Sequence, residues 1–232
     1  MNYFAHGYAY VDDPWFLAGT AVPDWLNVSD RGVRVRPKHA AAFADDPDPR
    51  VSALARGIAR HHQDDAWFHS TAAFADLSWR FTAQLRDLLG ADEGLRPSFL
   101  GHVLVELLLD ASLIAGEPER LDRYYEALSS VDAGFVEEAV NRMAPKRAVR
   151  LAVFLPLFVR ERFLCDYAED GKLCYRLNQV MRRVRLPPLP ERLKEFLPAA
   201  RRDVDACRQE LLSPDGPPSA GRPPAESTRS TR

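Results

Sequence analysis

Two stretches of this sequence carry side chains of the kind that bind metal ions, each at steps of four residues. Their members are His61, Asp65 and His69 in the first stretch and His102, Glu106 and Asp110 in the second. Because a step of four residues keeps side chains on one face of an α-helix, each set predicts a helix with a polar stripe. No stretch of any length shows the alternation of polar and apolar residues that is typical of a half-buried strand.

The second stretch is otherwise almost entirely apolar. From Phe99 to Ala111 the chain reads FLGHVLVELLLDA, so Leu and Val surround its three polar side chains. A helix this apolar is expected to be buried, and a buried carboxylate needs a partner cation. Two such stripes in one chain of 232 residues indicate a metal centre between helices, and hence a hydrolase.

Helical periodicity extends along most of the chain and predicts an all-α fold with a single domain over residues 1–210. The predicted helices cover approximately residues 13–26, 49–70, 72–89, 97–115, 117–128, 133–143, 146–167, 171–183 and 190–212. Residues 213–232 are rich in Pro, Ser and Gly and poor in apolar side chains. Such a composition cannot bury enough surface to offset the entropy of ordering, so we expect a disordered tail.

Composition excludes several classes of protein. Apolar residues make up 46% and charged residues 28% of the chain, and the net charge of −2 gives no indication of nucleic acid as a partner. The longest apolar run, residues 151–159, is shorter than the ~20 residues that span a bilayer, so no membrane span is predicted. Cys165, Cys174 and Cys207 form no C-x-x-C pair, and the opening MNYFAH is not a signal peptide. We therefore expect reduced thiols and a cytoplasmic location.

The spacing within each stripe limits how many ions it serves. Residues four apart on a helix can bind one ion together, whereas residues eight apart are separated by roughly 12 Å of rise. The outer member of each stripe would then serve a second ion or a substrate. Mixed His and carboxylate ligands favour Mn, Zn or Fe, with one or two ions per chain. Asp24 and His6, both in apolar surroundings, are further candidate ligands.

Other interpretations of these residues remain open. The second stripe could form structural ion pairs with Arg60 or Arg80, and the first could be a solvated polar face. His6 alone could be a hydrogen-bonded structural residue. A basic run contains Arg31, Arg34, Arg36 and Lys38, and it is either a solvated loop or a binding site for a phosphate or an acidic partner.

Four segments together resemble the acyl carrier protein phosphodiesterases, or ACP hydrolases, over residues 1–115. Residues 1–6, MNYFAH, resemble the family's Met-Asn-x-x-Ala-His start, and residues 18–24, AGTAVPD, are similar to its Gly-Asn-x-x-x-Asp segment. Residues 57–65, GIARHHQDD, are similar to its Gly-Ile-x-x-His-x-x-x-Asp helix. Residues 106–111, ELLLDA, resemble its Asp-x-x-x-Asp-His helix.

The resemblance implies an HD-like all-α fold, Mn-type metal ions and hydrolysis of the phosphodiester that joins 4′-phosphopantetheine to a carrier-protein serine. The chain departs from the family's pattern at several positions: His69 and Glu106 stand where the family has Asp, and Ala111 stands where it has His. His102, one turn before Glu106, is an added imidazole. The chain also lacks the adjacent His-Asp pair of plain HD phosphohydrolases.

The sequence therefore predicts a metal-dependent phosphoester hydrolase, with an acyl carrier protein or a small phosphoester as substrate. Predicted metal ligands are His6, Asp24, His61, Asp65, His69, Glu106 and Asp110. Predicted acid–base groups are His69, His102 and Glu106. The alternatives are a non-catalytic helical binding module with a degenerate metal site, and a hydrolase that resembles zinc phospholipases or acts on nucleotides.

Overall fold

The computed structural model describes residues 1–90 and 94–212, and every regular element in these residues is helical. The all-α prediction is confirmed. The predicted disordered tail, residues 213–232, lies outside the described residues. The helices are α1 (Tyr3–Gly7), α2 (Pro14–Ser29), α3 (Pro37–Ala41), α4 (Pro49–Phe68), α5 (Ala72–Leu89), α6 (Pro97–Gly116), α7 (Pro118–Ser129), α8 (Ala133–Met143), α9 (Leu151–Glu161), the 3-10 helix η1 (Phe163–Ala168), α10 (Asp170–Arg183), α11 (Leu193–Ala206) and α12 (Arg208–Leu212).

Most predicted helices are present, and the differences have local causes. The predicted helix 146–167 is two elements, α9 and η1, because Arg162 between them adopts a left-handed backbone with φ 42°. The predicted helix 190–212 divides at Cys207 into α11 and α12. Two five-residue helices, α1 and α3, were not predicted because a single turn is too short to show a hydrophobic period.

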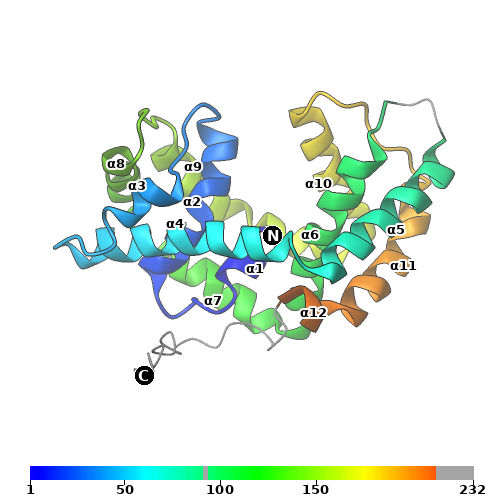
Figure 1. Ribbon diagram of the computed structural model, residues 1–232, viewed down its shortest axis with the longest axis horizontal. Helices are drawn as coiled ribbons and strands as arrows, with labels where there is room; N and C mark the ends of the chain where they lie inside the picture. The colour runs from blue at the N-terminus through cyan, green and yellow to red at the C-terminus, as the bar shows by residue number, and fades with distance from the viewer. Residues whose placement is uncertain (91–93, 213–232) are drawn as a thin grey trace, which may run out of the picture.

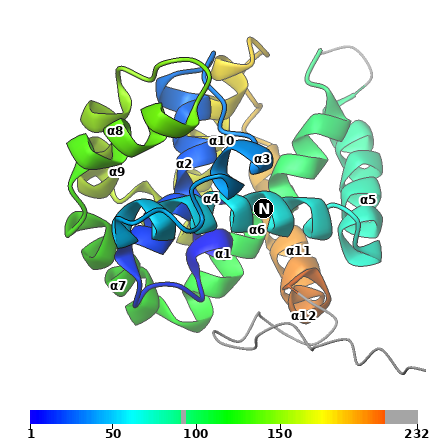
Figure 2. The same ribbon diagram turned by 60° about the vertical axis from the view of Figure 1, so that its left-hand side comes forward.

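The helices form two groups that meet at the middle of the molecule (Figure 1, Figure 2). In one group α2 packs along α4, with α3, α7, α8 and α9 around them. In the other α5 packs along α6, with α11 beside them and α10 packed against α11 and η1. The carboxyl end of α4 points towards α6 in both views. This arrangement brings the two polar stripes of the sequence to the junction of the two groups.

Two glycines let α2 and α4 approach each other closely. A Cβ added to Gly19 would lie 2.4 Å from the carbonyl oxygen of Leu54, and one added to Gly57 would lie 2.2 Å from the carbonyl oxygen of Phe16. Any larger side chain at either position would therefore collide with the backbone of the facing helix. The close approach matters for the site, because His61 follows Gly57 by one helical turn.

Helix α6 is the apolar helix expected from the sequence, and it lies in the core. Its buried residues include Leu104, Leu108 and Leu109. By length and composition it is the one helix among the described residues that could cross a membrane, with a mean hydropathy of 1.7, but 61% of that window is buried inside the protein. Because the core helix of a globular protein has the same properties, this similarity is weak support for a membrane span.

Candidate metal centre

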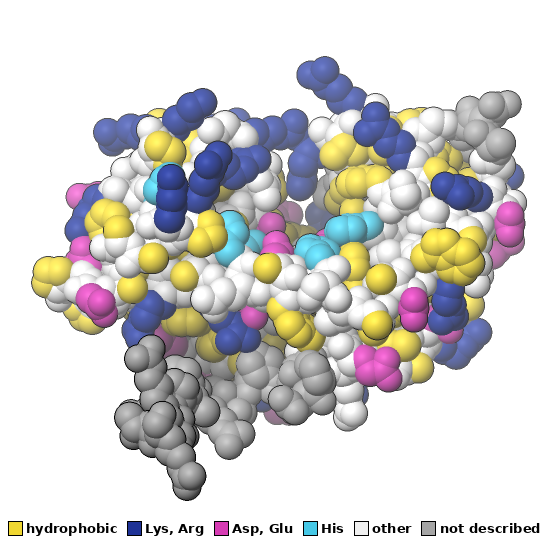
Figure 3. Space-filling model, in the orientation of Figure 1, with side chains coloured by type: hydrophobic (Ala, Val, Ile, Leu, Met, Phe, Trp, Pro, Cys, Tyr) yellow, Lys and Arg dark blue, Asp and Glu magenta, His cyan; other side chains and the backbone are white. Residues whose placement is uncertain are grey.

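Five of the six residues in the two predicted stripes lie in two clusters of candidate ligand atoms, and these clusters do not coincide with the stripes. His61 and Asp65 of α4 join His6 of α1, whereas His69 joins His102 and Glu106 of α6. Within each cluster the candidate ligand atoms all lie within 4.8 Å of one another. Figure 3 shows His and acidic side chains gathered at the centre of one face, in the hollow between the two groups of helices. His69 leaves its stripe because it is the C-cap of α4, where the chain turns towards α5.

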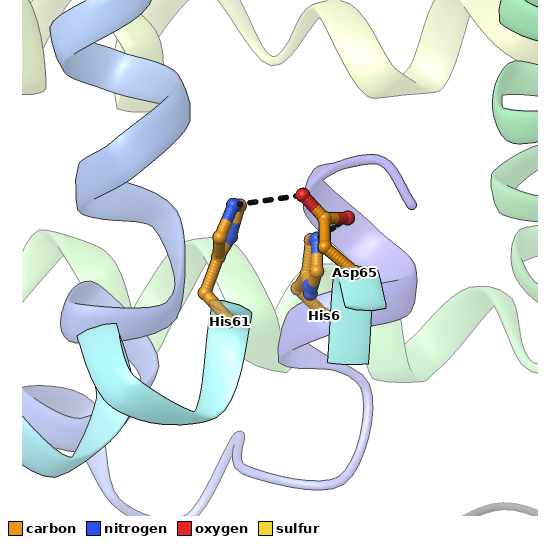
Figure 4. A group of neighbouring side chains, drawn as sticks. All are labelled: His6, His61 and Asp65. Atoms are coloured by element: carbon orange, nitrogen blue, oxygen red, sulfur yellow. Dashed lines mark ion pairs between the residues drawn. The ribbon is translucent and has the colours of Figure 1, made fainter. Parts of the chain in front are cut away.

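The first cluster consists of two imidazoles that face one carboxylate (Figure 4). The Nε2 atom of His6 lies 3.3 Å from Oδ1 of Asp65, and Nε2 of His61 lies 3.5 Å from Oδ2 of the same residue. The two rings stack with their centroids 4.0 Å apart. Both histidines are buried, whereas the Asp65 side chain is 35% exposed, so the cluster opens to solvent on the carboxylate side.

The hydrogen bonds of His61 define its tautomer. Its Nδ1 atom lies 2.8 Å from the carbonyl oxygen of Thr20, and because a carbonyl only accepts, Nδ1 carries the proton. Burial is the main cause that lowers the pKa of His61, so the ring is neutral and Nε2 presents a lone pair. This lone pair faces a carboxylate oxygen of Asp65. Two acceptors in that position call for a cation between them, and a hydrogen-bonded imidazole of this kind is a typical metal ligand.

His6 is buried without a complete hydrogen bond at either ring nitrogen. Burial lowers the pKa of His6, but the neighbouring Asp64 and Asp65 raise it by a larger amount. The net pKa of His6 is therefore above its ordinary value. Asp65 shows the complementary shift: burial raises its pKa, and His6 and His61 outweigh burial and hold that pKa well below the usual range. An incompletely bonded, buried imidazole beside an ionised carboxylate fits a metal ligand.

A cavity of about 280 Å³ adjoins the first cluster. It is lined by His61 and Asp65 together with Asp24, Arg34 and Arg36. Asp24, a predicted metal ligand, therefore lies at the same cavity but outside the three-residue cluster. The basic run noted in the sequence thus contributes two of its arginines to the walls of the cavity. Guanidinium groups beside a cluster of candidate metal ligands form an environment suited to a phosphoryl group.

The second cluster joins the turn after α4 to helix α6. The Nε2 atoms of His69 and His102 lie 3.0 and 3.3 Å from the same oxygen, Oε1 of Glu106. Their rings are nearly parallel, with an angle of 22° between the planes and centroids 4.9 Å apart. Burial raises the pKa of Glu106, but the Met1 amine and the two imidazoles outweigh burial and keep the carboxyl ionised.

The amine of Met1 lies between the two clusters. Its nitrogen is 2.7 Å from Oδ1 of Asp65 and 3.3 Å from Oε1 of Glu106. Burial lowers the pKa of this amine, but the two carboxylates raise it by a larger amount, so the net pKa is above its ordinary value. A single cation therefore contacts both carboxylates, which places the two clusters next to each other.

The remaining predicted ligand, Asp110, belongs to neither cluster. Its Oδ1 accepts a hydrogen bond from the backbone N–H of Ala5 (2.7 Å), and its Oδ2 accepts from the N–H of Phe4 (3.0 Å) and the side-chain amide of Asn2 (2.9 Å). Burial raises the pKa of Asp110 to about 7, although these backbone donors lower it. In this structure both of its oxygens hold helix α1 in place, so Asp110 positions His6.

The alternative ion pairs proposed for the second stripe are also accounted for. Arg60 pairs with Asp64 at 2.6 Å, and Arg80 pairs with Asp203 at 2.6 Å. Neither arginine contacts Glu106 or Asp110 through a described ion pair. The second stripe is thus surrounded by imidazoles, an amine and backbone donors.

Sequence reasoning missed three parts of the site: the Thr20 carbonyl, the Met1 amine and the contact of Asp64 with His6 at 3.8 Å. The first two are main-chain groups, which cannot be recognised from the pattern of residue types. Asp64 adjoins Asp65 in the sequence, and its burial could have been suspected from the helical period, since it lies on the side of α4 that faces His6.

Comparisons of this chain with known protein families, with curated proteins and with solved structures give no match.

Proposed function

We propose that this protein is a metal-dependent phosphoester hydrolase whose centre is formed by His6, His61 and Asp65. The observation that carries the proposal is the neutral Nε2 atom of His61, which faces an ionised Asp65 at the wall of a cavity that also presents Arg34 and Arg36. Two imidazoles and a carboxylate are the donor set of Mn, Zn or Fe sites. When bound, such an ion supplies Lewis-acid activation of the phosphoryl group and of a water molecule.

Other residues near the centre would orient the imidazoles, transfer a proton and bind the phosphate. The carbonyl of Thr20 orients the imidazole of His61, as hydrogen-bonding partners commonly do for metal-binding histidines, and Asp64 lies 3.8 Å from Nδ1 of His6. Asp24 lies at the same cavity and would accept a proton or complete the ligand set. Arg34 and Arg36 offer positive charge to the non-reacting oxygens of a phosphate.

The finer assignments belong to the same proposal. An HD-like helical bundle is consistent with a site built from α1 and α4, and the four segments of sequence resemblance supply its motifs. The resemblance points to an acyl carrier protein or a small phosphoester as substrate, and the cytoplasmic location stays a prediction. The cavity of about 280 Å³ would accommodate a phosphoryl group with a small substituent, and a carrier protein would contact the surface around it.

The test combines metal content with hydrolysis. Protein purified without chelator is assayed for bound transition metal and for hydrolysis of an aryl phosphodiester with added Mn²⁺ or Zn²⁺. We expect activity in the wild type and its loss in Asp65→Asn, with the helical circular dichroism spectrum unchanged because Asp65 is partly exposed. Asp87→Asn, on α5 away from the site, is the control. Full activity in Asp65→Asn would show that this centre is not the active site.

A non-catalytic helical binding module is the second candidate. The ion pairs of the Met1 amine with Asp65 and Glu106 favour it, since they balance both carboxylates with a group of the chain itself. No hydrolysis with any added metal, together with an absence of bound metal, would favour this candidate.

A further inference from the structure

The second cluster has the geometry of a metal site in its own right. His69, His102 and Glu106 present two Nε2 atoms and one carboxylate oxygen, with nitrogen-to-oxygen distances of 3.0 and 3.3 Å. In a tetrahedral zinc site with bonds of about 2.0–2.2 Å, neighbouring ligand atoms are roughly 3.3 Å apart. The two nitrogen-to-oxygen separations are therefore already close to those between zinc ligands, and all three ligand atoms lie within 4.8 Å of one another, so a small displacement would admit the ion.

We propose that His69, His102 and Glu106 form a second, separately loaded site for a divalent transition metal of the zinc class. Two imidazoles and one carboxylate are a common donor set for zinc, and they leave a coordination position for water or a substrate. The side chains of His69 and His102 are 33% and 44% exposed, so the open position faces solvent. The proposal goes beyond the hydrolase centre, which uses none of these three residues.

The charges around Glu106 support this assignment. Oε1 of Glu106 lies 3.3 Å from the Met1 amine, and Oδ1 of Asp65 lies 2.7 Å from the same nitrogen. A divalent cation at His69 and His102 would add to the charge that the Met1 amine supplies to Glu106. Binding of such an ion requires that each of the two Nε2 atoms presents a lone pair to it.

Metal at this site would link α4 directly to α6, two helices that each pack mainly on other helices. His69 is the C-cap of α4, which packs mainly on α2, and His102 and Glu106 lie on α6, which packs mainly on α5. The three ligands thus bridge the two groups of helices seen in Figure 1. Because an ion that binds only the folded state stabilises it, zinc is expected to raise the melting temperature through this site.

The two sites have separate ligands, so each can be removed alone. The experiment measures zinc stoichiometry and affinity by titration of the chelator-stripped full chain, in the wild type, His61→Ala, His102→Ala and the double variant. We expect the wild type to bind two zinc ions, each single variant to bind one, and the double variant to bind none. His39→Ala, which removes a histidine outside both clusters, is the matched control and is expected to bind two ions.

Cobalt and heat provide readouts that do not depend on activity. The His61→Ala variant, which lacks the hydrolase centre, should retain the visible absorption of tetrahedral Co²⁺, and His61→Ala/His102→Ala should lose it. Saturating zinc should raise the melting temperature of His61→Ala by about 5 °C or more and leave the double variant unchanged. His69→Gln tests the second imidazole with a side chain of similar size, and we expect zinc affinity to fall at least about 100-fold.

Each outcome bears on the proposal. If His102→Ala and His69→Gln bind as many zinc ions as the wild type with equal affinity, the proposal is overturned and the cluster is an ion-paired contact between helices. If His61→Ala retains one ion with the Co²⁺ spectrum while phosphodiester hydrolysis is absent in every variant, the second site stands and the proposed hydrolase function fails.

Discussion

The imidazole of His6 stacks on that of His61, with ring centroids 4.0 Å apart and planes at 25°. The two residues are 55 positions apart in the sequence, and each presents its Nε2 atom to a different oxygen of Asp65. The stack forms because Asp110 holds α1 against α6 while the Gly19–Gly57 contact sets the position of α4. The candidate metal centre thus depends on two contacts that lie outside it.

Replacing Asp110 by Ala tests the first of these contacts. The backbone N–H groups of Phe4 and Ala5 would lose their acceptor, and a buried unsatisfied donor costs about 1–3 kcal/mol. We expect the free energy of unfolding, measured in urea, to fall by roughly 3 kcal/mol and bound metal to fall with it. In Asp122→Ala, which loses an exposed ion pair with Arg162, the change should stay below about 1 kcal/mol. Equal stability of the two variants would contradict the role given to Asp110.

Replacing Gly57 by Ala tests the second contact. The added methyl group would lie 2.2 Å from the carbonyl oxygen of Phe16, so α4 must move away from α2. We expect a loss of about 1–3 kcal/mol in the free energy of unfolding and weaker metal binding at His61, one turn further along. Gly171→Ala, where nothing lies within 4 Å of the new methyl group, should be neutral or stabilising by up to about 1 kcal/mol. Unchanged metal affinity in Gly57→Ala would show that the helix contact does not position His61.

Arg36 tests whether the cavity binds a phosphoryl group. It lines the cavity beside His61 and Asp65, and a charge-assisted hydrogen bond to phosphate contributes about 1.5–3 kcal/mol. Arg36→Ala should raise the KM for a phosphodiester about tenfold or more and leave metal content unchanged. Lys38→Ala removes a positive charge from the same segment but outside the cavity lining, and its KM should stay within about twofold of the wild type. Equal effects of the two substitutions would mean that the segment acts only through its net charge.

The pH dependence of metal binding follows from His6. The opposing effects of burial and of Asp64 and Asp65 leave its pKa above the ordinary value of 6.5, so the metal-free protein carries a proton there that metal must displace. In the metal-free protein this raised pKa contributes stability that is full below pH 6.5 and is lost as the pH rises through the folded-state pKa. We therefore expect metal affinity to increase as the pH rises from 6.5 through the folded-state pKa of His6. Calorimetry in two buffers should show that metal binding below this pKa releases a proton. Affinity independent of pH in His6→Gln, with the slope retained in His39→Ala, would identify the group.

Sequence patterns predicted which segments are helices and which of their faces are polar. The four-residue steps at His61, Asp65, His102 and Glu106 are a property of the local chain, because the period of an α-helix is the same in every protein. The apolar residues of α6 likewise predicted its burial. For the same reason the periodicity could not reveal α1 and α3, which are single turns.

Only the tertiary structure decided how the candidate ligands are grouped. His69 belongs with His102 because the chain turns at the end of α4, and His6 belongs with His61 because α1 is fixed by backbone hydrogen bonds to Asp110. Neither relation has a signal in residue spacing, since one depends on where a helix ends in space and the other on donors that every residue possesses. The sequence by itself determined which residues are candidate ligands and that α4 and α6 are helices. The packing of those helices determined which ligands meet, because side chains distant in sequence converge only when a close-packed core brings their backbones together.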